Sequence, residues 1–185
     1  VINMTNKFFS DDYRIRLRTT MQIYWDQIFM TSSASGNLFK RYKLHPVMAD
    51  LVYRGFSEID RVNFGSPHIP DYYSVSKGQK WRDLTGNYTR YGDVLPLLLD
   101  SDNKYVIMNA GDEIKLKFDA SSLPKIKKGW TRHFLFYNDG WLKDGDLNTA
   151  QGQTVEPLPF HGMESYPYKD RGAFPNDQFY RNYQE

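Results

Sequence analysis

No stretch of the sequence carries the apolar spacing of an α-helix over ten residues, and this most constrains the fold. An α/β sheet needs crossover helices between its parallel strands, so that class is not expected. The chain instead contains six or more short runs with strand-like alternation or composition, separated by turn residues. We therefore expect an all-β protein, a β-sandwich of jelly-roll type with long irregular loops and an extended C-terminal tail.

Four regions carry the strand predictions. Residues 13–23 place apolar side chains at alternate positions, which predicts a long strand with one solvated face. Residues 132–137 are apolar at both parities, which predicts a strand buried on both faces. Residues 105–108 and 114–118, separated by a turn sequence, predict an antiparallel hairpin. A further extended region is expected around Leu51, Val52, Tyr53 and Phe56.

The expected organisation is an N-terminal arm (1–12), a sandwich domain (13–168) and a C-terminal tail (169–185). Residues 60–83 and 157–185 are rich in proline, glycine and aromatic residues, so we expect irregular structure there. Ordering such segments costs on the order of 1–2 kcal/mol of backbone entropy per residue, which contacts along the domain's own flank or on another protein must offset. The predicted partner-binding residues are Tyr72, Tyr73, Trp81, Tyr166, Tyr168, Phe174, Phe179, Tyr180 and Tyr183.

Charge and cysteine content exclude several functions. The formal charge is only +2 with scattered basic residues, so nucleic acid is not expected as a partner; the lysines at 125, 127 and 128 are interpreted as a solvated loop. There are no cysteines, which excludes disulfides, thiolate metal sites and cysteine catalysis. No run approaches the roughly 20 apolar residues of a membrane helix, so no transmembrane segment is expected. The chain starts at Val1 without a signal-peptide pattern, which suggests a processed or trimmed native chain.

A loop rich in oxygen side chains is the main metal-site candidate. Asp144, Asp146 and Asn148 alternate as the first ligands of calcium loops do. An EF-hand would need glycine at the sixth position and glutamate at the twelfth, where this chain has Thr149 and Val155. Two roles remain, an irregular calcium site or Asx-turn and capping chemistry, and the second is favoured. The candidate calcium ligands are Asp139, Asp144, Asp146 and Asn148.

Catalytic motifs are missing from the sequence. The four histidines are widely separated, so we expect no zinc site, and His133 and His161 are assigned to structural hydrogen bonds. There is no nucleophile elbow, P-loop or dinucleotide fingerprint. Many pairs among the 22 acidic residues could be proposed as the two carboxylates of a glycosidase, so the sequence alone identifies no such pair. We predict that the protein is not an enzyme and has no cofactor, with calcium as the one alternative.

Long strings of the sequence resemble a known family. The strings YTRYGDVLPLLLDSDNKYVIMNAGDEIKLKFDASSLP (88–124) and GWTRHFLFYNDGWLKDGDLNTAQGQTVEPLPFHGMESYPY (129–168) resemble the C-terminal region of large bacterial exported proteins. Those proteins carry FG-GAP-type repeats with ASPIC/UnbV-like segments, are CRTAC-like, and often stand beside tetratricopeptide repeats. MQIYWDQIFM with LVYRGFSEID matches the upstream part, so the resemblance covers about Arg14 to Tyr168. It implies an extracytoplasmic, non-enzymatic module in large assemblies. This chain departs from the family by lacking the propeller-like repeats.

The expected function is a non-catalytic accessory domain that docks through its loops and tail on a larger extracytoplasmic or membrane-associated complex. Its partners would be other protein subunits, and its location would be periplasmic, peripheral on a membrane complex where one is present. The first alternative is a carbohydrate- or calcium-dependent ligand-binding module. The second is a hydrolase with an unrecognised carboxylate pair.

Overall fold

The computed structural model describes residues 2–18, 27–30, 39–60, 63–66, 68–143, 145–149, 151–169, 174 and 177–185. The chain forms two compact units, Val1–Phe39 and Lys40–Glu185. The arm, domain and tail expected from the sequence stay a prediction; the division into units falls elsewhere, at residue 39.

The described part of the first unit contains neither helix nor strand. The strand expected over residues 13–23 does not form at residues 13–18, and the rest of it lies outside the described residues. The physical reason is that alternation needs a neighbouring strand and a buried face. Here Tyr13, Ile15 and Leu17, the apolar set of the alternation, are all exposed. The ring of Phe8 packs edge-on against Tyr13, with 5.1 Å between centroids.

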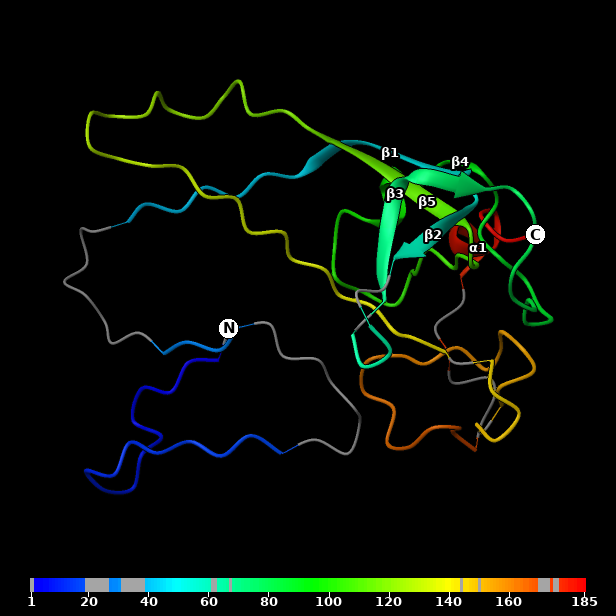
Figure 1. The fold of residues 1–185 in the computed structure, drawn as a ribbon, viewed down its shortest axis with the longest axis horizontal. Helices are drawn as coiled ribbons and strands as arrows, with labels where there is room; N and C mark the ends of the chain where they lie inside the picture. Colours follow the sequence, from blue (N-terminus) through cyan, green and yellow to red (C-terminus); the bar gives the residue numbers. More distant parts are fainter. Residues whose placement is uncertain are drawn as a thin grey trace. The chain divides into compact units, whose positions relative to one another are not determined.

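The second unit contains two small antiparallel sheets (Figure 1). In the three-stranded sheet β1 lies between β4 and β5, and in the two-stranded sheet β2 pairs with β3. Only two short helical turns accompany them, so the all-β class is confirmed for the described residues. The bounds are β1 Pro46–Tyr53, β2 Phe56–Asp60, β3 Ile69–Ser76, β4 Gly92–Asp93, a 3-10 helix Leu95–Leu97, β5 Asp112–Phe118 and α1 Gln178–Arg181.

The strands near Leu51 and Phe56 confirm the expected extended region at residues 51–58. Residues 60–83 are not wholly irregular, because β3 occupies eight of them. β3 forms although Pro70 is its second residue, because a proline in an edge strand can direct its missing N–H away from the partner strand. β2 is its described partner, from Phe56 opposite Ser76 to Asp60 opposite Ile69.

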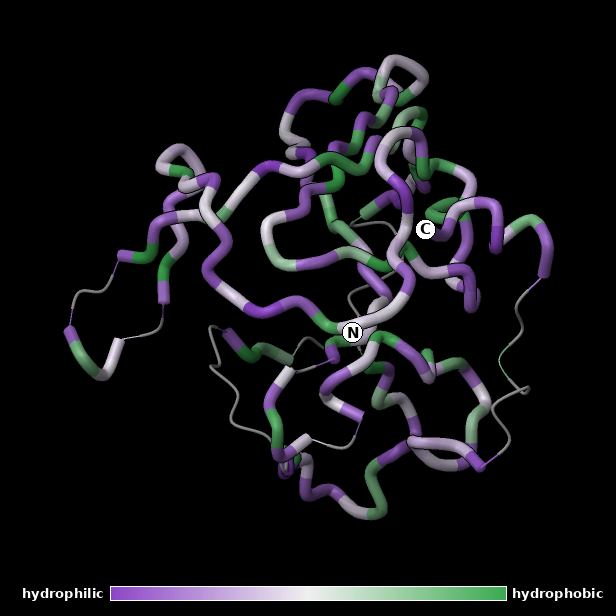
Figure 2. The backbone as a smooth tube through the Cα atoms, turned by 90° about the vertical axis from the view of Figure 1, so that its right-hand side faces the viewer, coloured by the Kyte–Doolittle hydropathy of each residue, from purple (hydrophilic) through white to green (hydrophobic). Residues whose placement is uncertain are grey.

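The core of the second unit lies on one face of β1. Ala49 and Leu51 are buried and stand opposite Leu116 and Ile114 of β5, so the four side chains share one face of the sheet. Val94, also fully buried, closes this face and donates its N–H to the carbonyl of Ala49 at 3.0 Å. The core is small, and Figure 2 shows hydrophobic residues (green) interspersed with hydrophilic ones (purple) along the backbone.

Irregular segments are attached to one another through residues 84–90. Thr85 forms a parallel bridge with Thr154, and Thr89 forms an antiparallel bridge with Gln184. Thr89 is buried; its N–H donates to the carbonyl of Ile107 at 2.9 Å, and its hydroxyl accepts the N–H of Ile107 at 2.8 Å. This single segment therefore connects three parts of the chain that are distant in sequence.

The hairpin predicted from residues 105–108 and 114–118 is wrong, although its turn forms. The N–H of Asp112 donates to the carbonyl of Asn109 at 3.1 Å, as in a β-turn. Residues 105–108 are not a strand, however, and β5 pairs with β1 instead. The reason is competition for backbone groups, because the N–H and the carbonyl of Ile107 are both hydrogen-bonded to Thr89. β5 pairs instead with β1, whose residues Ala49 and Leu51 are buried.

The buried strand predicted at residues 132–137 is also wrong. Residues 130–143 contain no helix, strand or turn, and Leu135 is 91% exposed. None of residues 131–143 makes a backbone–backbone hydrogen bond within the described part of the chain. The apolar pattern requires a neighbour on each side, and the described structure supplies none. Within the described structure, residues 132–137 contact the rest of the second unit through Arg132, which donates to the carbonyl of Pro124 at 2.7 Å, and through Phe136, whose ring centroid lies 6.4 Å from that of Phe118.

Candidate binding sites

The loop proposed for calcium behaves as a turn at its described positions. Asp146 accepts the N–H of Asn148 at 2.8 Å and its side-chain amide at 3.1 Å, which is an Asx-turn. Asp139 instead contacts Ser101 and His161, and Asp144 lies outside the described residues. No group of three or more acidic or histidine side chains suited to a metal occurs in the part of the chain that the structure describes. The calcium hypothesis stays a prediction for this loop.

A polar and aromatic cluster gathers around Trp141. The indole N–H of Trp141 donates to the hydroxyl of Tyr105 at 3.0 Å, and that hydroxyl donates to Asn103 Oδ1 at 3.0 Å. His161 meets the same Oδ1 with its backbone N–H at 2.8 Å and its ring Nδ1 at 2.9 Å. We call these residues, with Ser101 and Asp139, the Trp141 cluster. Burial of the Tyr105 ring raises the pKa of its phenol, and the hydrogen bond from Trp141 opposes that rise.

The cluster contains serine, aspartate and histidine, but not in the order that a hydrolase needs. Asp139 Oδ2 accepts the hydroxyl of Ser101 and lies 3.3 Å from His161 Nε2. In a catalytic triad the histidine stands between the other two, so that it can take the serine proton. Here the aspartate stands between them, and the serine proton points to a carboxylate. The arrangement therefore supports a structural hydrogen-bond role, as expected for His161; His133 likewise contacts the hydroxyl of Thr131 at 3.2 Å.

The C-terminal residues pack on the second unit itself. Tyr180 has no exposed surface, and its hydroxyl donates to the carbonyl of Tyr105 at 3.0 Å. Burial raises the pKa of the Tyr180 phenol to about 12. The N–H of Tyr88 and the carbonyl of Glu185 are 2.9 Å apart, and the reciprocal bond is equally long. Tyr180 is thus a core residue that fixes the tail, rather than a residue that faces a partner.

Tyr183 and Phe179 lie near this attachment. The guanidinium of Arg90 lies 4.8 Å from the ring centroid of Tyr183, whose ring packs against Phe179 at 5.3 Å. Phe179 is 46% exposed and so remains available to a partner. Phe174 is half-buried, and its ring packs against Tyr180 with 6.0 Å between centroids.

The other predicted partner-binding residues differ in the exposure of their side chains. Tyr73 is 92% exposed, and Trp81 is also exposed. Tyr166 and Tyr168 donate to the carbonyls of Pro157 and Leu158, each at 2.9 Å, and so help to order their own loop. The structure does not bring these aromatic residues together into one described patch.

Tyr72 belongs to a charged network that the sequence did not predict. Its hydroxyl donates to Glu113 Oε2 at 2.9 Å, and the Arg54 guanidinium lies 4.1 Å from its ring centroid. Arg54 Nε also meets Glu113 Oε2 at 3.2 Å, with both side chains largely buried. The hydrogen bond from Tyr72 to the Glu113 carboxylate raises the pKa of the phenol. No spacing could have revealed the network, since its members come from the β1–β2 turn, β3 and β5.

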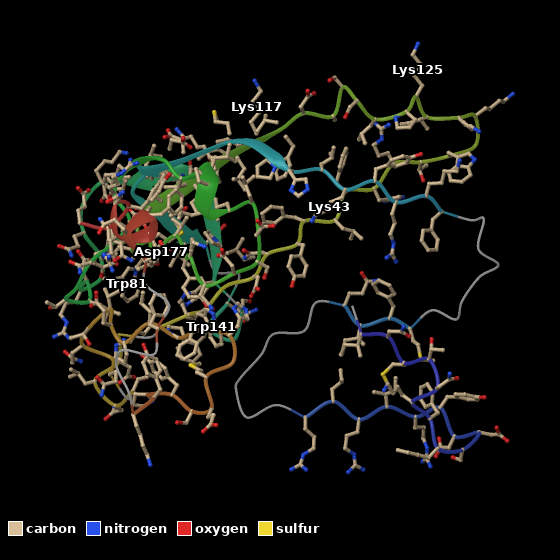
Figure 3. The ribbon with its side chains drawn as sticks, turned by 180° about the vertical axis from the view of Figure 1, so that it is seen from behind. Lys43, Trp81, Lys117, Lys125, Trp141 and Asp177 are labelled. Atoms are coloured by element: carbon tan, nitrogen blue, oxygen red, sulfur yellow. The ribbon has the colours of Figure 1, made fainter. Side chains whose placement is uncertain are left out.

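The segment of residues 120–138, which we call the basic arm, exposes a run of apolar side chains. Figure 1 shows the chain leaving β5, running outward and returning (yellow-green to yellow). Phe134, Leu135, Phe136 and Tyr137 are between 68% and 91% exposed, and they are consecutive. The arm also carries four Lys or Arg residues and no acid. In Figure 3 the side chains of Lys117 and Lys125 extend outward from the ribbon.

Comparisons with protein-family profiles, with curated proteins and with solved structures find no match to this chain. Within the described residues, no helix has both the length and the apolar character required to cross a bilayer.

Proposed function

We propose that the protein is a non-catalytic accessory domain that docks on a larger protein assembly. The observation that carries the proposal is the basic arm, whose consecutive residues Phe134–Tyr137 are exposed although they have the composition of a buried strand. Single exposed apolar side chains are ordinary, but a contiguous run of this size is typical of an interaction site. Aromatic residues and arginine also dominate the energetics of interfaces.

The docking surface differs from the one expected from sequence. The tail contributes to the core through Tyr180, so its role is mainly to order the domain, and Phe179 is its outward-facing aromatic residue. Tyr73 and Trp81 remain candidates for additional contacts, because their rings are exposed. We therefore assign the principal docking role to the basic arm.

Recovery of the full chain from its native extract tests this function. Size-exclusion chromatography should place the wild-type chain in a complex well above monomer size. The double variant F134S/F136S should elute as a monomer. The control F9S/F64S removes two aromatic rings that are at least as exposed and should stay with the complex. A wild-type chain that elutes as a monomer would overturn the proposal.

Two finer expectations belong with this function. We propose that the two sheets form a β-sandwich of jelly-roll type, supported by their separate antiparallel pairing. We also propose a bacterial, periplasmic location, peripheral to a membrane complex where one is present, supported by the resemblance of residues 14–168 to exported proteins. Cell fractionation with antibodies against the chain tests the location.

A ligand-binding role is the second candidate, because the Trp141 cluster combines an exposed indole with exposed polar groups. Trp141 is 49% exposed, and its ring packs against His161 at 6.0 Å between centroids. Trp141 beside carboxylate and hydroxyl groups suits a sugar, which offers an apolar face and hydroxyl edges. Calorimetry with an oligosaccharide panel tests it; no heat with any sugar at millimolar concentration removes this candidate.

A further inference from the structure

The charges of this chain are unevenly distributed, although its net charge is small. Residues 39–49 and 120–138 together hold seven of the 24 Lys and Arg residues and none of the 22 Asp and Glu residues. The rest of the chain therefore has 17 basic and 22 acidic residues, a net charge of −5. Such asymmetry favours an acidic partner at the basic segments and disfavours one elsewhere.

Sheet register brings these two segments to the same end of the three-stranded sheet. Pro46 at the start of β1 stands opposite Phe118 at the end of β5. Because the strands are antiparallel, residues 40–45 and residues 119–125 leave the sheet at that end. The positive charges of both segments therefore act from one side of the second unit.

The basic arm also contains backbone N–H and carbonyl groups that form no backbone–backbone hydrogen bond in the described structure. Residues 131–137 make no backbone–backbone hydrogen bond in the described structure, and their sequence, TRHFLFY, is rich in strand-forming residues. A segment with unpaired N–H and carbonyl groups can pair with another chain, as the exposed edge of a sheet does. Side chains at alternate positions, such as Phe134 and Phe136 against Leu135 and Tyr137, would then contact the partner from both faces.

Resting on the proposed function, we propose that the basic arm receives an extended acidic segment of a partner polypeptide by strand addition at residues 131–137. Main-chain hydrogen bonds supply the affinity in this mode, and side-chain complementarity supplies specificity. Here Lys125, Lys127, Lys128 and Arg132 provide the positive complement to the acidic side chains.

The same features favour a polypeptide over the two other polyanions, a bilayer and a nucleic acid. Insertion into a bilayer would carry the unpaired N–H and carbonyl groups of residues 131–137 out of water, at a cost of several kcal/mol per group. A nucleic acid would leave Leu135 without a stacking role, since bases stack on aromatic rings. A bilayer and a nucleic acid are also large enough to contact the remainder of the chain, whose net charge of −5 would repel a polyanion.

The experiment measures binding of the full chain to three fluorescein-labelled ten-residue peptides by anisotropy. One alternates Glu and Val, the second has Lys for Glu, and the third is the Glu–Val peptide with every backbone amide nitrogen methylated. The unmethylated acidic peptide should bind at least tenfold more tightly than either control, and it should slow amide exchange of residues 131–137. Equal binding of the N-methylated peptide would overturn strand addition, because that peptide has no backbone N–H donors.

Matched variants separate local charge from net charge. K125Q/K127Q/K128Q should weaken acidic-peptide binding about tenfold, because each exposed pair contributes a fraction of a kcal/mol. R16Q/R18Q/K169Q removes the same number of charges elsewhere and should change it less than twofold. Equal losses, or tighter binding to phosphatidylserine-containing vesicles or to a 20-nucleotide DNA strand, would overturn the proposal. If peptides fail but the chain still enters a native complex through Phe134 and Phe136, only the partner chemistry is wrong.

Discussion

Substitution of Tyr180 tests whether the C-terminal residues hold the second unit together. The side chain has no exposed surface, its ring packs on Phe174 at 6.0 Å, and its hydroxyl is bonded to the carbonyl of Tyr105. Removal of a buried aromatic ring costs about 3–5 kcal/mol, through lost transfer free energy and the cavity that remains. Loss of the hydroxyl alone costs about 1 kcal/mol. Tyr180→Ala should therefore lower the free energy of unfolding by about 3–5 kcal/mol, and Tyr180→Phe by about 1 kcal/mol.

Urea unfolding followed by tryptophan fluorescence measures both losses. Since a small domain has a free energy of unfolding of about 5–15 kcal/mol, the alanine variant should show a much lower midpoint at 25 °C. Phe179→Ala is the matched control, because Phe179 is the adjacent aromatic residue and is 46% exposed. Phe179→Ala should lower the free energy of unfolding by less than about 1.5 kcal/mol. The reasoning is refuted if the two alanine variants lose equal stability, since burial would then not determine the loss.

Three further predictions concern pH, capping and backbone conformation. The Tyr180 pKa of about 12 exceeds its unfolded value of 10.0, so its stabilisation is complete below pH 10 and lost as the pH rises toward 12. By urea unfolding, the loss between pH 9 and pH 11 should be smaller in Tyr180→Phe; an equal loss contradicts this. Asp177→Ala removes the cap that accepts the N–H of Tyr180 at 2.8 Å and should cost about 1 kcal/mol in the same assay; an unchanged midpoint rejects it. Gly111 and Gly129 both have positive φ, but a Cβ at Gly111 would lie 2.8 Å from Tyr53 Cε2 and one at Gly129 would meet nothing within 4 Å. By thermal unfolding Gly111→Ala should be the more destabilising, by about 1–3 kcal/mol; equal shifts exclude the clash.

The sequence predicted the all-β class and an extended region around Leu51 and Phe56, because both depend on local pattern. Leu51 lies in a run of β-forming residues, and no segment has a helical period, so the all-β class follows from composition and spacing. The turn at Asn109–Asp112 was equally local, since asparagine, glycine and aspartate specify it without help from distant residues. The Asx-turn role of Asp146 was predicted on the same ground.

Pairing could not be predicted, because it depends on which distant segment competes for each backbone edge. Ile107 bonds to Thr89, 18 residues away, and this interaction displaces the local hairpin. The network of Arg54 and Glu113 likewise joins residues far apart in the chain. Partner choice of this kind follows from the packed arrangement and leaves no periodic signal in the sequence.

The failed prediction of a buried strand at residues 132–137 is the most informative of these differences. The apolar pattern of residues 132–137 is typical of a strand that is covered on both faces. The described part of the chain provides no neighbouring strand. The pattern and the structure therefore agree only if another molecule provides one. β5 carries the core side chains Ile114 and Leu116 and leads directly into the arm, which contacts its end through Phe118 and Phe136. A ligand that binds only the folded arm therefore stabilises the fold by mass action. Binding and folding of this unit are thus expected to be coupled, with the acidic peptide raising the melting temperature of the wild-type chain more than that of K125Q/K127Q/K128Q.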